Sequence, residues 1–173
     1  GDVGVVSEVG LGSTFWLEVP LRAVASVPDL GQDVRPAADD DALSGLQILV
    51  VDDSAFNLEV TRAMLEQSGA QVMTATDGEQ ALSVMRAVAF DCVLMDMQMP
   101  IMDGHTATMK IRQSPDNLRH IPIIALTANA MPSDRQKCLD AGMNDFLSKP
   151  FTLAQLQTML EHWLAVAKHN RHT

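Results

Sequence analysis

The chain has 173 residues, of which 47% are hydrophobic and 20% are charged, and its formal net charge is -10. This hydrophobic share is sufficient for a packed core and excludes a wholly disordered chain. The acidic balance disfavours nucleic acid as a partner, because the protein would repel the phosphate backbone, and it favours the binding of a metal cation.

Residues 1–23 are predicted to form a β-hairpin. Residues 3–8 are apolar and β-branched, and Gly10, Leu11 and Gly12 give a turn signal. Residues 13–19 then alternate, with Phe15 and Leu17 on one face. Because an isolated hairpin is marginal in water, we expect these residues to come from a larger sheet or to pack on another part of the chain.

Residues 24–45 are predicted to be a flexible linker. Pro28, Gly31 and Pro36 interrupt any periodicity, and residues 39–41 are three successive aspartates. The chain starts with Gly1 rather than methionine, and we expect it to be a piece of a longer protein.

Residues 46–168 are predicted to be one globular domain, followed by a tail over residues 169–173. Five short apolar runs, most of them without strict alternation, are typical of strands that are covered on both faces. They span residues 46–51, 71–75, 91–95, 121–126 and 143–147. Helical patterns separate them, so the order predicts an open parallel α/β sheet with helices on both faces.

Local signals place several of these helices. Phe56, Val60 and Met64 recur every four residues before Gly69, and a second helix is capped by Asp77. Further signals are Gly142 after a helix over residues 131–141, and a Thr152–Gln155 capping box before a stripe of Leu153, Leu156, Leu160 and Leu164.

Ionisable or hydroxyl residues follow four of the five predicted strands. Asp52 and Asp53 follow the first, Asp96 the third, Thr127 the fourth and Lys149 the fifth. The carboxyl ends of parallel strands share one sheet edge, where ligands bind. Converging carboxylates call for a cation, and Mg²⁺ with Lys149 and Thr127 would clamp a phosphoryl group. The pattern therefore predicts aspartyl phosphorylation assisted by Mg²⁺.

Four motifs carry a family resemblance across the whole of residues 46–168: ILVVDDSAFN, DCVLMDMQMPIMDG, IIALTANA and DFLSKPF. This segment resembles a response-regulator receiver domain and is similar in fold to the bacterial chemotaxis regulator. The resemblance implies a doubly wound, flavodoxin-like fold, in which five parallel strands take the order 2-1-3-4-5.

The resemblance also implies a metal site. Asp96 would be the phosphorylated residue, Asp53 would ligate Mg²⁺ directly, and Asp52 would hold the ion through water. The backbone carbonyl of Gln98 would be a further ligand, and Mn²⁺ can substitute for Mg²⁺. Gln98 and Asn129, each two residues past an active residue, would tune the lifetime of the acyl phosphate.

Further roles implied by the resemblance concern the switch. Thr127 would bond the phosphoryl oxygen and report its presence, while Lys149 would pair with it. The peptide bond before Pro150 is expected to be cis, which aims the lysine into the site. Phe146 takes the place of an aromatic switch residue that is often tyrosine, so switching here would act through packing alone.

The segment GVVSEVGLGSTFWLEVPL resembles the last glycine box and closing strands of a histidine-kinase ATPase domain. Its order, kinase end then linker then receiver, is that of a hybrid sensor histidine kinase. Other ATP-binding boxes and a phosphoacceptor histidine motif are missing, so no ATP-dependent kinase activity is expected of this piece.

The partners implied are the phosphohistidine domain of the parent kinase and a histidine phosphotransfer protein, with no nucleic acid. The two cysteines, Cys92 and Cys138, lack zinc or disulfide spacing and fit a reducing cytoplasm. We expect this piece to be cytoplasmic and to make no direct membrane contact, with its parent anchored in the inner membrane.

Three alternatives are weighed against this interpretation. A haloacid-dehalogenase-type phosphatase needs an acid two residues after its nucleophile, where this chain has Gln98. A transcription factor needs a DNA-binding segment, and residues 150–173 have room for one helix and a tail. A receiver that takes no phosphate and acts as a docking module to regulate the kinase stays open, although every residue type of the active site is present.

Overall fold

The computed structural model describes residues 1–8, 12–18, 20, 42–115, 117–128 and 132–170, and it divides into two compact units, residues 1–36 and 37–173. Asn129, the start of the glycine turn and most of the predicted linker lie outside the described residues. No helix in these ranges is both long enough and apolar enough to cross a membrane.

The first unit is an antiparallel hairpin of β1 (Asp2–Glu8) and β2 (Gly12–Glu18). One face carries the register pairs Val3–Leu17 and Val5–Phe15, and all four side chains are more than half exposed. On the other face, Trp16 packs so closely over Gly4 that a Cβ atom there would lie 2.5 Å from the indole ring. The predicted hairpin is therefore present, and the hairpin by itself leaves one of its faces apolar and exposed.

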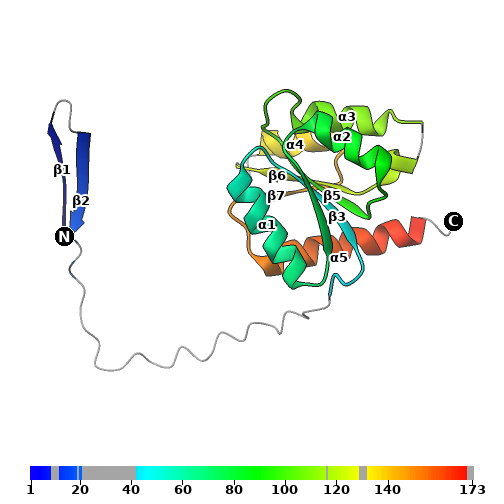
Figure 1. Cartoon of the computed structure of the whole chain (residues 1–173), viewed down its shortest axis with the longest axis horizontal. Helices are drawn as coiled ribbons and strands as arrows, with labels where there is room; N and C mark the ends of the chain where they lie inside the picture. The colour runs from blue at the N-terminus through cyan, green and yellow to red at the C-terminus, as the bar shows by residue number, and fades with distance from the viewer. Residues whose placement is uncertain (9–11, 19, 21–41, 116, 129–131, 171–173) are drawn as a thin grey trace. The chain divides into compact units, whose positions relative to one another are not determined.

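The second unit is a parallel sheet with helices on both faces (Figure 1). Its strands lie in the order β4-β3-β5-β6-β7. When the five strands are numbered by their place in this sheet alone, with β3 as the first, this is the predicted order 2-1-3-4-5. The strands are β3 (Gln47–Val51), β4 (Gln71–Ala75), β5 (Cys92–Asp96), β6 (Ile123–Thr127) and β7 (Asp145–Ser148). The helices are α1 (Ala55–Gln67), α2 (Gly78–Ala87), α3 (Gly104–Arg112), η1 (Asn117–His120), α4 (Pro132–Asp140) and α5 (Leu153–Asn170). The predicted fold class is confirmed.

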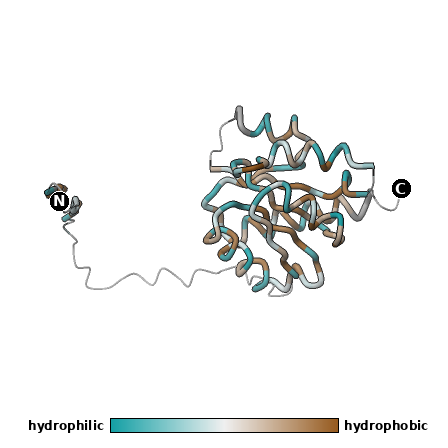
Figure 2. The backbone as a smooth tube through the Cα atoms, turned by 45° about the horizontal axis from the view of Figure 1, so that its top comes forward, coloured by the Kyte–Doolittle hydropathy of each residue, from teal (hydrophilic) through white to brown (hydrophobic). Residues whose placement is uncertain are grey.

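Two hydrophobic clusters cover the two faces of the sheet. Leu49, Val93 and Ile123 point to one side with buried residues of α2, α3 and α4. Ile48 and Leu94 point to the other side with buried residues of α1 and α5. In the hydropathy view, hydrophobic colour runs along the inner strands, whereas the helices alternate between hydrophobic and hydrophilic (Figure 2). Burial on both faces explains why the strand sequences lack polar alternation.

The predicted caps at the starts of α2 and α5 are present in the structure. Asp77 accepts hydrogen bonds from the amides of Glu79 at 2.8 Å and Gln80 at 2.9 Å. Gln155 Oε1 accepts from the Thr152 amide at 2.9 Å, and Thr152 Oγ1 accepts from the Gln155 amide at 3.3 Å, which completes the capping box. These bonds satisfy amides that have no partner within the helix.

The buried face of α1 differs from the stripe that predicted the helix. Phe56 and Val60 are 75% and 36% exposed, whereas Leu58 and Leu65 pack against the sheet. Both stripes repeat at helical spacing, and only the docking of the helix decides which of them faces the core. The helix was predicted correctly, but Phe56, Val60 and Met64 do not form its buried face.

The domain also differs from the prediction at both ends. Leu43, placed in the linker, is fully buried in the cluster beneath α1 and α5, and its amide donates to the Ser68 carbonyl at 2.9 Å. At the other end, α5 continues to Asn170 rather than ending at residue 168. Packed structure therefore starts before residue 46.

Candidate functional site

Strand register brings the predicted site residues to one edge of the sheet. Val51, which precedes Asp52, pairs with Met95, which precedes Asp96. Leu126, which precedes Thr127, is the partner of Asp96, and Thr127 pairs with Ser148, which precedes Lys149. Four strand ends therefore place their polar residues side by side, as predicted.

Three carboxylates converge at this edge. Ligand oxygens of Asp52, Asp53 and Asp96 all lie within 4.8 Å of one another. Asp52 is 1% exposed and Asp96 is 8% exposed, whereas Asp53 lies in solvent. Like charges at this separation repel unless a cation compensates them. A group of oxygen ligands with one open side fits a hard divalent cation such as Mg²⁺.

Lys149 supplies one positive charge to this group. Its Nζ lies 2.6 Å from Asp52 Oδ2 and 2.9 Å from Asp96 Oδ2. Burial alone would lower the pKa of Lys149, but its hydrogen bonds to Asp52 and Asp96 outweigh burial, and its pKa is raised. The lysine stays protonated and bridges two carboxylates, which leaves the site with excess negative charge.

At Asp96, unlike at Lys149, burial outweighs the hydrogen bonds in setting the pKa. Burial is the largest influence and raises its pKa, while the hydrogen bond from Lys149 lowers it and the charge of Asp52 raises it further. The balance is a pKa above the ordinary value of 3.8. The ionised carboxylate therefore costs free energy in the metal-free fold, and a bound cation would relieve this cost.

An Asp96→Asn variant should be more stable than the wild type at neutral pH in EDTA. Because folding favours protonated Asp96, its contribution to stability is fully present below the pKa of the unfolded chain and is lost as pH rises through the raised folded pKa. We expect Tm to rise by about 4 °C, equivalent to about 1 kcal/mol, and the difference to shrink in acid. Thermal unfolding at several pH values measures this effect. Asp140→Asn, on the exposed side of α4, is the control, and a lower Tm for Asp96→Asn would contradict the prediction.

Asn57 belongs to the site, and the sequence interpretation assigned it no role. Its Nδ2 lies 3.1 Å from Asp52 Oδ1 and 3.3 Å from Asp52 Oδ2. The Ser54 amide also donates to Asp52 Oδ1 at 2.9 Å. A signal was present, because an asparagine in the first turn of a helix, five residues after a strand-end aspartate, can turn back toward it.

The loop after Asp96 approaches the active carboxylate closely. The Gln98 amide lies 3.4 Å from Asp96 Oδ1, and a Cβ atom on Gly104 would lie 2.1 Å from the Asp96 backbone oxygen. This contact explains the glycine that starts α3. Ile101, at the tip, has a φ of 66°, which is unusual for a β-branched residue, and is 80% exposed.

The predicted switch residues lie on β6 and β7. Thr127 is buried, and its carbonyl accepts a hydrogen bond from the Lys149 amide at 2.7 Å. Phe146 is half-buried, and the Arg135 guanidinium carbon lies 5.9 Å from its ring centroid. The Lys149–Pro150 peptide bond is cis, as predicted. The position of Asn129 lies outside the described residues.

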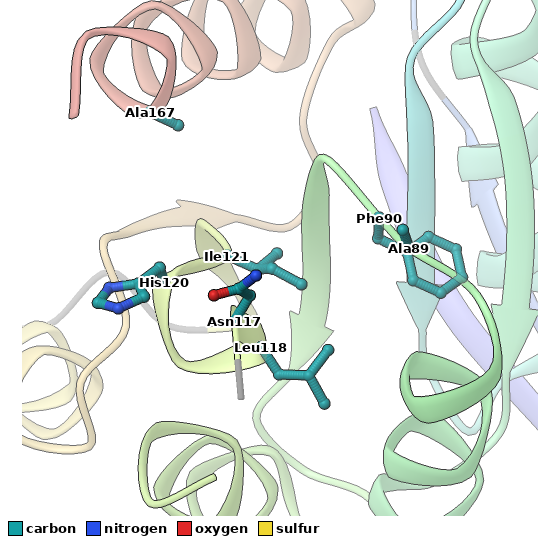
Figure 3. Close-up of a pocket in the computed structure, with 7 residues that line it drawn as sticks. All are labelled: Ala89, Phe90, Asn117, Leu118, His120, Ile121 and Ala167. Atoms are coloured by element: carbon teal, nitrogen blue, oxygen red, sulfur yellow. The ribbon is translucent and has the colours of Figure 1, made fainter. Parts of the chain in front are cut away.

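The structure also contains a cavity of about 600 Å³. Figure 3 shows the residues that line it. It is lined by Ala89, Phe90, Asn117, Leu118, His120, Ile121 and Ala167. Phe90 and Ile121 precede β5 and β6, so the cavity lies at the amino ends of the strands, opposite Asp96. None of the described residues that line it is a carboxylate or one of the predicted site residues, so we assign it no part in the chemistry at the strand ends.

Comparison with known proteins supports the interpretation of residues 46–168 as a receiver domain. The family model described as "Response regulator receiver domain" matches residues 48–161. The sensor histidine kinase AruS of Pseudomonas aeruginosa is 41% identical over 161 residues, which cover 92% of this chain and 15% of that protein. The aerobic respiration control sensor protein ArcB of Escherichia coli K12 is 36% identical over 163 residues, which cover 93% of this chain and 20% of that protein. The chain thus spans at most a fifth of these two relatives.

A solved structure matches the second unit. It is the receiver domain of sensor histidine kinase PA1611 from Pseudomonas aeruginosa PAO1, described with a magnesium ion coordinated in its active site cleft. The match has 46% identity and a TM-score of 0.66, and it covers 70% of this chain and 99% of that one. From the family match, the sheet order and the acidic strand ends together, we conclude that this chain belongs to the response regulator receiver domain family.

Proposed function

We propose that this chain is the phosphoacceptor of a two-component phosphorelay and that Asp96 takes the phosphoryl group from a phosphohistidine. The observation that carries the proposal is the meeting of Asp52, Asp53 and Asp96 within 4.8 Å beside the Lys149 ammonium group. Asp53, Asp96 and the Gln98 carbonyl would hold Mg²⁺ or Mn²⁺, with Asp52 acting through water. Bound there, the cation would neutralise charge on the phosphoryl oxygens.

The transfer step needs a nucleophile and a leaving group in line. A carboxylate oxygen of Asp96 attacks phosphorus while the phosphorus–nitrogen bond to the imidazole breaks, and the bonding electrons stay on the nitrogen. Lys149 bridges Asp52 and Asp96 before transfer, so its ammonium group is already within reach of a phosphoryl oxygen. Hydrolysis or transfer to a second histidine then removes the group, and Gln98 and Asn129 would tune how long it stays.

Phosphorylation would switch the surface near α4. The new charge of about −2 on Asp96 would draw the Thr127 hydroxyl inward. Phe146 lies one strand further, half-buried and stacked with Arg135, so it can respond by repacking rather than through a hydroxyl. These two residues form our proposed link between the site and the α4 surface.

The wider context that we propose is a hybrid sensor histidine kinase, with residues 1–23 as the end of its ATPase domain. Two features support this origin. The alignments with AruS and ArcB, over 161 and 163 residues, are too long to fit within the second unit. The hairpin also exposes Val3, Val5, Phe15 and Leu17 together, as a strand pair taken from a larger sheet would.

In that context, the phosphohistidine domain of the parent kinase would donate the group and a histidine phosphotransfer protein would receive it. The piece would act in the cytoplasm while its parent is anchored in the inner membrane. A receiver that only docks to regulate the kinase is the alternative, and it requires no chemistry at Asp96.

Intact mass spectrometry after incubation with acetyl phosphate and Mg²⁺ tests the proposal. We expect a gain of about 80 Da, the mass of one phosphoryl group. The gain should disappear in EDTA and in Asp96→Asn, and it should persist in Asp77→Asn, a matched exchange at the cap of α2.

A gain that survives in Asp96→Asn would place the phosphoryl group elsewhere and contradict the assignment. If no gain occurs, the next measurement is binding of beryllofluoride, which mimics the acyl phosphate. Binding would indicate rapid hydrolysis at a working site, and its absence would favour the docking module.

A further inference from the structure

We infer that Asn57 is a positioning residue that holds the Asp52 carboxylate in place for cation binding, an inference that rests on the proposed function. Asn57 lies in the first turn of α1, three residues after the N-cap Ser54. Side chains on a helix tilt toward its amino end, so the amide of Asn57 points back to the strand end. Its nitrogen lies within 3.3 Å of both Asp52 oxygens.

The contacts of Asp52 use its acceptor positions fully. Oδ1 accepts from the Ser54 amide and from Asn57, and Oδ2 accepts from Lys149 and from Asn57. A carboxylate offers about four lone-pair positions, so these four contacts leave none free. Asp52 is thus an anchor, and it can accept from a water molecule or take a metal ion only by losing a donor such as Lys149.

Asp53 and Asp96 differ from Asp52 in this respect. Among the described residues, the Asp53 side chain makes no hydrogen bond or ion pair, and it lies in solvent. Asp96 accepts from Lys149 at 2.9 Å and, more weakly, from the Gln98 amide at 3.4 Å. Asp53 and Asp96 therefore have oxygen positions open for a metal ion, whereas Asp52 is fixed by its hydrogen bonds. Asn57 is the side chain of α1 that fixes it.

The chemistry of the amide suits this task. Asn57 carries no charge, so it stabilises the Asp52 carboxylate without repelling a cation as a lysine would. When Lys149 turns to a phosphoryl oxygen, Asp52 loses its contact at 2.6 Å, and Asn57 is then its remaining side-chain donor among the residues described above. Asparagine is also a poor helix former, and the cap of α1 is already Ser54, so helix formation does not explain the choice of residue.

The test is an NMR titration of the full chain with Mg²⁺, in which the chemical shift of the Asp53 backbone amide reports binding. We expect Asn57→Leu to weaken Mg²⁺ binding about tenfold, the usual scale for removing the partner of a ligand. The backbone amide shifts of Asn57→Leu away from Asp52, Asp53 and Asp96 should stay like those of the wild type. Weaker Mg²⁺ binding in a fold that is otherwise unchanged marks positioning and not general damage.

Gln157→Leu is the matched control. Its buried amide donates to Ser68 Oγ at 2.9 Å, at the other end of α1, so its loss weakens the fold without touching Asp52. Equal weakening of Mg²⁺ binding in both variants, or wild-type binding by Asn57→Leu, would overturn the inference. Failure of the wild type itself to bind Mg²⁺ would instead overturn the proposed function.

Asn57→Ala provides a second variant if Asn57→Leu does not fold. If neither folds, the side-chain amide protons of Asn57 in the wild type decide the matter. Their shifts should follow Mg²⁺ with the same midpoint as Asp53, and shifts that stay constant throughout the titration would overturn the inference.

Discussion

Replacing Lys149 with methionine should lower the free energy of unfolding in EDTA by about 3 kcal/mol, because removal of one partner leaves buried charges uncompensated. Lys149 is the cation shared by Asp52 and Asp96, which are 1% and 8% exposed. Methionine keeps much of the length of the side chain, so the lost interaction is mainly the charge. Denaturation by urea, at neutral pH and without metal, measures the change.

Two conditions should partly rescue Lys149→Met. Acid favours the protonated form of Asp96, whose folded pKa is already raised by burial, so the deficit should shrink as pH falls. Saturating Mg²⁺ should stabilise the variant more than the wild type, because the cation replaces the missing positive charge; binding at 100 times Kd contributes about 2.7 kcal/mol.

The wild type gives the complementary pH dependence. The pKa of Lys149 is raised above its ordinary value of 10.5, so its contribution to folding stability is fully present below that value and is lost only as pH rises through the higher folded pKa.

The control for Lys149→Met is Lys110→Met, on the exposed side of α3. Equal urea midpoints for Lys149→Met and the wild type in EDTA would contradict the bridging role.

Arg112→Met should cost about 4 kcal/mol of folding free energy, because it removes a half-buried guanidinium that joins three segments. Nε donates to the Gly142 carbonyl at 2.7 Å, and Nη2 donates to Asn144 Oδ1 at 2.8 Å. Nη1 donates to the carbonyls of Arg119 and Ile121, each at 2.9 Å. Burial lowers the pKa of Arg112, so these acceptors are what make its charge tolerable at this depth.

Urea denaturation of Arg112→Met, Arg112→Lys and Arg62→Met tests this role. An ammonium group cannot span acceptors arranged around a planar fork, so lysine should rescue little. Arg62 pairs with Glu59 at 2.9 Å on an exposed surface, and its loss should cost less than about 1 kcal/mol. A small effect of Arg112→Met, similar to that of Arg62→Met, would show that the network is dispensable.

The Arg112 network also illustrates a limit of sequence interpretation. Its acceptors lie up to 32 residues from Arg112 along the chain. No local pattern marks such a side chain, because an arginine in the last turn of a helix usually lies in solvent. Only the meeting of α3, the segment before β6 and the segment before β7 shows that it is half-buried and bonded to all three.

The acidic site was more accessible to prediction. Polar residues stand at the end of an apolar strand or just after it, and strand ends in a parallel sheet must meet at one edge; these residues are Asp52, Asp53, Asp96, Thr127 and Lys149. The order of strands and helices, and the caps at Asp77 and Thr152, also depend on residues that are close together in the sequence. The fold class and these members of the acidic cluster were therefore predictable.

The tertiary structure decided what depends on packing between distant segments. Helical spacing could not tell whether Phe56 or Leu58 faces the sheet, because either stripe fits one side of α1. Leu43 looked like linker until its burial beneath α1 and α5 was seen, and Asn57 gained its role only from its distance to Asp52. By itself, the sequence determined the order of elements and the chemistry at the strand ends, since both follow from neighbours along the chain. Which faces are buried and which side chains support the site was decided by tertiary contacts.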